Sequence, residues 1–90
     1  MHPDSVAAVR PAIQAMIEAS RAEDGCILYA FAEDVLQPGV IRISEKWESW
    51  DALKAHGATD HMATWRAALA DIGILGRDVV AFEMGEIREL

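Results

Sequence analysis

The spacing of apolar residues changes along the chain from helical to alternating, which limits the folds that the chain can adopt. Residues 5–21 carry apolar side chains three or four positions apart, the spacing of one helix face. Residues 40–47 instead alternate, so that Ile41, Ile43 and Trp47 share one face of an expected strand. Helical spacing followed by alternation predicts a mixed α+β domain.

The other segments extend this order. The expected elements are a helix over 5–21, strands over 26–32 and 40–47, a short helix over 50–56, a longer helix from 61 to about 72, and a last strand over 78–87. Pro38-Gly39 is a turn signal, so the first two strands are predicted to form a hairpin. Pro11 predicts a kink in the first helix, because proline cannot donate a backbone hydrogen bond. The order matches a ferredoxin-like βαββαβ domain with an antiparallel sheet whose first strand is missing.

Length and charge narrow the classes of partner. The 90 residues make a single domain over 1–90, and the hydrophobic fraction of 52% suggests that some apolar surface is covered by a second subunit. Fifteen acidic and eight basic residues give a net charge of -7, which argues against nucleic acid and membrane surfaces as partners. No apolar run is long enough to span a membrane and no signal peptide is expected, and the single cysteine, Cys26, suits a reducing compartment. We therefore expect a cytoplasmic protein.

Residues 45–66 (EKWESWDALKAHGATDHMATWR) contain all three tryptophans and two of the three histidines. His61 falls in the first turn of an expected helix, where the backbone dipole disfavours imidazolium, so a neutral ring could accept a proton. Trp65 lies one turn further along the same face. A pocket wall and a histidine packed in the core against tryptophan explain this pair equally well.

Other residues of this region also have two interpretations. Glu45 interrupts an apolar strand face and needs a partner, or it reaches solvent at the strand end. Tyr29 is expected on the strand face of Ile27 and Phe31, where its hydroxyl could bond a ligand or end at the sheet edge. Trp47 is consistent with core packing, and the position of His56 in a last helical turn is explained by the helix dipole alone.

No metal site is expected from ligand spacing. His56 and His61 are not at the i, i+4 spacing of a helical metal motif, and Gly57 interrupts any helix between them. Cys26 opens an apolar strand, where an inert thiol is the simpler interpretation.

The segment from Glu45 to Met62 resembles the signature of the antibiotic biosynthesis monooxygenase (ABM) domain family, particularly its quinol-monooxygenase-like members. The positions that carry the resemblance are Glu45, Trp47, Ala55, His56, Thr59, His61 and Met62. Upstream, Gly25, Cys26 and Tyr29 match the family's Gly-Cys-x-x-Tyr strand. The similarity runs from about Val6 to the last expected strand. Members normally begin with a strand ahead of the first helix, and this chain departs from them there.

The resemblance implies a dimeric α/β barrel of ferredoxin-like subunits, with a pocket between sheet and helices. It also implies oxygenation of quinols or polyketide phenols by O2, with no metal, flavin or haem cofactor. On this basis we expect His61 to act as the catalytic base or as an oxyanion donor, with Tyr29 and Glu45 as catalytic groups that orient the substrate, a small aromatic or quinone-like molecule. The substrate-binding wall would comprise Trp47, Trp65, His56 and Met62.

Two other functions fit the same residues. A neutral histidine and a carboxylate could isomerise a small hydroxy-ketone without oxygen. Alternatively, the chain could be a non-catalytic dimer that binds a small molecule. Dimerisation itself is expected face to face through the sheets, because one helix layer covers only one face. Arg42 would lie at that contact or in solvent.

Overall fold

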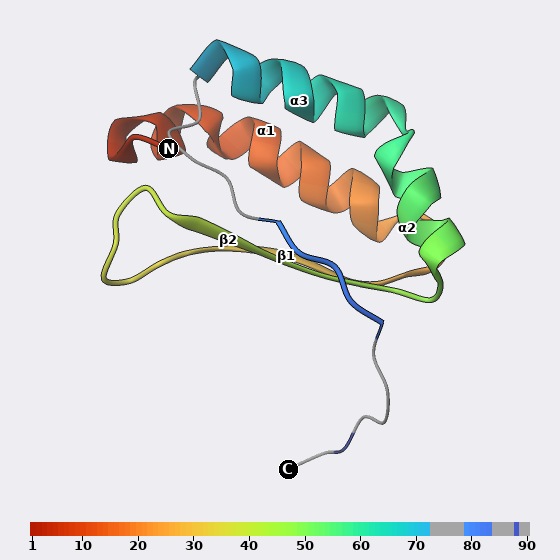
Figure 1. The fold of residues 1–90 in the computed structure, drawn as a ribbon. Coiled ribbons are helices and arrows are strands. Elements are labelled where there is room, and N and C mark those ends of the chain that lie inside the picture. The colour runs from red at the N-terminus through yellow and green to blue at the C-terminus, as the bar shows by residue number, and fades with distance from the viewer. Residues whose placement is uncertain (73–78, 84–87, 89–90) are drawn as a thin grey trace.

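The computed structural model describes residues 1–72, 79–83 and 88 (Figure 1). The elements in chain order are α1 (Pro3–Arg21), β1 (Cys26–Glu33), β2 (Ile41–Trp47), α2 (Trp50–Gly57) and α3 (Asp60–Ile72). The helices α1 and α3 run side by side and pack above a two-stranded sheet, and α2 lies at one end of it (Figure 1). The predicted hairpin and the three predicted helices are confirmed.

The first helix begins earlier than expected and is not interrupted by Pro11. The ring of His2 caps it by accepting a hydrogen bond from the backbone N–H of Asp4 at 3.2 Å. Pro3 occupies the first turn, where a backbone N–H has no helical partner to lose. No strand precedes α1 in the residues that the structure describes.

The sheet register differs from simple alternation at the start of β1. Tyr29 pairs with Glu45 and Phe31 with Ile43, but an irregularity between Cys26 and Leu28 places Cys26 opposite Trp47. One extra residue in a strand moves the residues before it to the opposite face. Ile27 is therefore 63% exposed, and Cys26 packs against the core. The prediction that Ile27 shares the face of Tyr29 is wrong for this reason.

The hairpin loop is organised by Asp34. One carboxylate oxygen accepts hydrogen bonds from the backbone N–H groups of Leu36 and Gln37, and the other accepts from Arg42 at 2.9 and 3.2 Å. The hydrogen bonds from Arg42, followed by that from Leu36, lower the pKa of Asp34. Arg42 was expected to contact solvent or a second subunit, and within the chain it is paired with Asp34.

The core lies between the two long helices and the sheet. Its buried members are Val9, Met16, Tyr29 and Trp65. Trp65 of α3 reaches the sheet, where its ring meets that of Phe31 edge to face at a centroid distance of 5.5 Å. Met62 and Leu69 of α3 pack on the same cluster.

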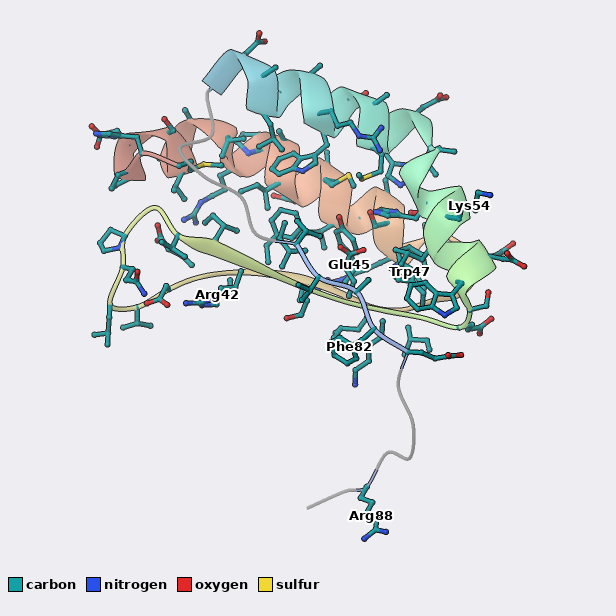
Figure 2. All side chains as sticks on the ribbon, in the orientation of Figure 1. Arg42, Glu45, Trp47, Lys54, Phe82 and Arg88 are labelled. Carbon is teal, nitrogen blue, oxygen red and sulfur yellow. The ribbon has the colours of Figure 1, made fainter. Side chains whose placement is uncertain are left out.

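The expected last strand over 78–87 is only partly described. Residues 79–83 are not in a strand, and the remaining positions of that segment lie outside the described residues. Val79, Val80 and Phe82 expose most of their surface, and Phe82 lies away from the helices (Figure 2). None of the helices in the described part of the chain is long and apolar enough to cross a membrane.

Gly25, in the turn between α1 and β1, should not tolerate a side chain. Its φ of 82° lies in the left-handed region, and an added Cβ would approach the Cβ of Ala52 to 2.8 Å. We expect Gly25→Ala to lower the free energy of unfolding by about 1–3 kcal/mol. Gly57→Ala is the matched control, because a Cβ there meets nothing within 4 Å and should change stability by at most about 1 kcal/mol. Urea unfolding of both variants checks this, and equal stabilities would contradict it.

Candidate functional site

A single carboxylate holds two histidines together. Glu23, in the turn after α1, places Oε2 2.5 Å from Nδ1 of His56 and 2.8 Å from Nε2 of His61. The two imidazole centroids are 5.8 Å apart. His56 is buried, and Glu23 and His61 are half-buried. The cluster thus joins three segments of the chain around one oxygen atom.

The short connection between α2 and α3 brings the histidines to the same side. The hydroxyl of Thr59 donates to the carbonyl of His56 at 2.7 Å and accepts from the N–H of Met62 at 3.3 Å. It therefore binds the end of α2 and caps the start of α3. Arg66 adds a hydrogen bond to the carbonyl of Gly57 at 2.8 Å. Because α2 ends at Gly57, His56 and His61 do not share one helix, as the sequence predicted. The turn that follows nevertheless brings the two histidines together.

Glu45 has two partners on the helix side of the sheet. Its Oε1 accepts a hydrogen bond from Nε1 of Trp47 at 3.0 Å and lies 3.8 Å from Nε2 of His56. Figure 2 shows both Glu45 and Trp47 on the side of the sheet that faces the helices. Glu45, which interrupts the apolar strand face, therefore accepts a hydrogen bond from Trp47 and faces His56.

Tyr29 is buried among aromatic rings at the centre of this region. Its ring centroid lies 5.3 Å from that of His56, 5.7 Å from Phe31 and 6.4 Å from Trp47. Burial, followed by the negative charge of Glu45, raises the pKa of Tyr29 to about 12. The nearby hydroxyl of Ser20 opposes this rise in pKa. However, Ser20 Oγ has no partner in good hydrogen-bond geometry, so we consider that contact weak.

Cys26 lies near the same acids. Burial, followed by the charges of Glu23 and Glu45, raises the pKa of the thiol. A thiol with a raised pKa is a poor nucleophile, in agreement with the inert role expected from its apolar context.

Two cavities adjoin the core. The smaller, about 130 Å³, lies between α1 and α3 and is lined by Ala12, Ala15, Met16, His61, Thr64 and Trp65. The larger, about 380 Å³, lies between α1 and the sheet, and none of the predicted site residues lines it. A small molecule in the smaller cavity would contact the imidazole of His61 and the indole of Trp65.

The structure brings most of the predicted site residues together. Tyr29, Glu45, Trp47 and His56 form one packed group, and His61 joins it through Glu23. Trp65 and Met62 pack nearby on α3 as part of the core. Sequence reasoning missed Glu23, because nothing distinguishes it locally from an acidic residue in a turn.

Comparison with known sequences identifies the family. The sequence model of the family described as "Antibiotic biosynthesis monooxygenase" matches residues 1–68. The Mycobacterium tuberculosis protein named "Putative monooxygenase Rv0793" is 34% identical over 70 residues, which cover 78% of this chain and 68% of that protein.

Solved structures give the same result. A crystal structure from Deinococcus radiodurans, titled as a putative antibiotic biosynthesis monooxygenase, has a TM-score of 0.89 and 31% identity, covering 97% of this chain and 86% of that one. The structure of Rv0793 has a TM-score of 0.75 and 32% identity, covering 98% and 87%. The family match spans well over half of the sequence, and the fold agrees with the structures of related proteins. The chain therefore belongs to the antibiotic biosynthesis monooxygenase family, with its α+β, ferredoxin-like fold.

Proposed function

We propose that this protein is a monooxygenase that oxidises a small phenolic or quinol substrate with O2. Family membership supports oxygenation as the type of reaction. The observation that carries the proposal is the contact of Glu23 with His56 and His61 beside the rings of Tyr29 and Trp47. Aromatic side chains match an aromatic substrate, and the histidines supply groups that accept protons.

The first step is removal of a proton from the substrate. When Nε2–H of His61 donates to Glu23, Nδ1 of the same ring is left as a proton acceptor. The Glu23 carboxylate fixes the ring and stabilises the imidazolium that forms. The resulting substrate anion is electron-rich and can pass an electron to O2. For a phenol with a neighbouring methylene, CH2 and O2 become C=O and H2O, so no further reductant is needed.

Tyr29 serves this reaction as a hydrogen-bond donor rather than a base. With its pKa raised to about 12, the phenol keeps its proton at neutral pH. A protonated phenol can stabilise negative charge that develops on a substrate oxygen. Glu45 and Trp47, which are hydrogen-bonded to each other, would fix the neighbouring wall.

The titration of Tyr29 can be measured directly, because it is the single tyrosine of the chain. We expect its ultraviolet ionisation midpoint to lie near pH 12 in the folded protein and near pH 10 in urea. The folded state thus holds a proton that the unfolded state has lost, so stability should fall as pH rises from about 10 to 12. Tyr29→Phe should abolish this component of the pH dependence. A folded-state midpoint near 10 would contradict the assignment.

The role of His61 predicts a loss of turnover in defined variants. With an anthrone- or menadiol-type substrate under oxygen, we expect His61→Ala to lower the rate by about 10²–10⁴-fold. Glu23→Gln should also lower the turnover rate, because an amide stabilises imidazolium less well than a carboxylate does. His2→Ala is the control, since His2 caps α1 and is not in the cluster. A wild-type rate no faster than buffer would refute the proposal for the substrates tried.

An anaerobic assay separates oxygenation from the other proton-transfer function. The same histidine and carboxylates could isomerise a hydroxy-ketone, a reaction that needs no oxygen. We expect turnover to stop when O2 is removed and to resume in proportion to O2 when it is returned. Turnover that persists without O2 would favour the isomerase. Ligand-induced stabilisation without turnover in either gas would indicate a binding protein.

We also propose that the protein is a homodimer, supported by the apolar residues that a single chain leaves exposed. Leu28 on the sheet and Val79, Val80 and Phe82 after α3 are exposed in the described structure.

Phe82→Asp should therefore shift the dimer towards monomer or unfold the chain, because burying a charge in an apolar interface is costly. Val35→Asp is the control, since Val35 is also an exposed apolar residue but lies in the hairpin loop. Sedimentation equilibrium measures the change. A folded wild-type monomer at micromolar concentration would refute the dimer.

A further inference from the structure

We propose that Glu23, His56 and His61 form a binding site for a divalent transition-metal ion. Each of the three side chains offers one ligand atom, and these atoms all lie within 4.8 Å of one another. The atoms are Oε2 of Glu23, Nδ1 of His56 and Nε2 of His61. The site goes beyond the proposed oxygenase activity and does not depend on it.

The distances suit replacement of protons by an ion. In the hydrogen-bonded state, Oε2 lies 2.5 and 2.8 Å from the two nitrogens. A tetrahedral Zn²⁺ with bonds of about 2.0–2.1 Å keeps its ligand atoms about 3.3 Å apart. Each contact with Oε2 therefore has to open by less than about 1 Å, and the two nitrogens, which lie within 4.8 Å of each other, have to approach by up to about 1.5 Å. Small rotations of all three side chains can supply these changes. The ion would then take the place of the protons that now join the ligands.

The surroundings of His56 resemble those of a metal-binding histidine. The residue is 3% exposed, and while Nδ1 faces Glu23, Nε2 lies 3.8 Å from Oε1 of Glu45. Histidines that bind metals commonly direct their other ring nitrogen at a carboxylate, which fixes the ring. Glu45 is itself held by Nε1 of Trp47 at 3.0 Å. The cluster thus has an outer layer of support as well as three inner ligands.

The ligand set indicates the class of ion. Two imidazoles and one carboxylate suit Zn²⁺, Fe²⁺, Co²⁺ or Ni²⁺ rather than Mg²⁺ or Ca²⁺, which prefer oxygen ligands. Three protein ligands leave at least one position open for water or a small ligand. Because the ligands come from the turn after α1, from α2 and from α3, a bound ion would also connect these three parts of the fold.

The test is a titration of the full chain with the metal alone. After treatment with EDTA and buffer exchange, calorimetry with ZnCl2 should give one ion per chain, and the unfolding temperature should rise by several degrees. Co²⁺, used as a spectroscopic probe, should give visible bands typical of a four- or five-coordinate site. Glu23→Gln and His61→Ala should each weaken Zn²⁺ binding at least about tenfold, the loss seen when a supporting residue is removed.

The control variant is His2→Ala, which removes the remaining histidine of the sequence and should leave Zn²⁺ affinity unchanged. Circular dichroism of each variant without metal checks that it is folded. If His61→Ala does not fold, Glu23→Gln alone tests the site. The proposal is overturned if the wild type binds no Zn²⁺, or if a folded Glu23→Gln binds it as tightly as the wild type. Binding lost in His2→Ala would also overturn it, by placing the ion at the N-terminus.

Discussion

The packing of Trp65 is the interaction on which the fold depends most. A sheet of two strands has little buried surface of its own, so the core has to come from the helices above it. Trp65 lies on α3, yet its ring contacts Phe31 on β1 and packs in the same cluster as Val9 and Met16 of α1. One indole thus connects α3, α1 and the sheet in a single core. The candidate site lies beside this core and takes its rigidity from it.

The cluster of Glu23, His56 and His61 is in direct contact with the aromatic rings of the core. His56 is in contact with Tyr29 and Trp47 through its ring faces, while its nitrogens are directed at Glu23 and Glu45. A buried imidazole with a carboxylate near each nitrogen has its orientation determined from both sides. Proton transfer and ion binding would use the same side chains, because an ion would occupy Nε2 of His61 and Oε2 of Glu23, so they are alternative states of the cluster.

Most of the fold could be predicted from sequence because its elements are defined by local signals. The apolar spacing in α1 and α3, the alternation in β2 and the Pro38-Gly39 turn each depend on neighbouring residues. The shift at Cys26 could not be predicted, since an extra residue in a strand leaves the pattern of residue types unchanged. The last expected strand also differs, because residues 79–82 are apolar but residues 79–83 make no strand in the described structure.

The site was predicted less completely, for a related reason. Resemblance to a known signature identified His56 and His61, but spacing along one helix is a poor guide when the two residues lie on either side of a turn. Glu23 is 33 positions from His56 and 38 from His61 in sequence, and no local pattern connects residues so far apart. Its partnership with both rings follows from the packing of α1 against α3 and of α2 against β2.

The shared oxygen of Glu23 has a consequence for how the protein can change over evolutionary time. If His56 or His61 is replaced, the carboxylate of Glu23 loses one of its two partners. The other histidine then contacts a carboxylate whose surroundings have changed. The effect of a second substitution would then depend on the first, in either order. The three positions should accordingly behave as one inherited unit, retained together or exchanged together, although they lie in separate segments of the chain.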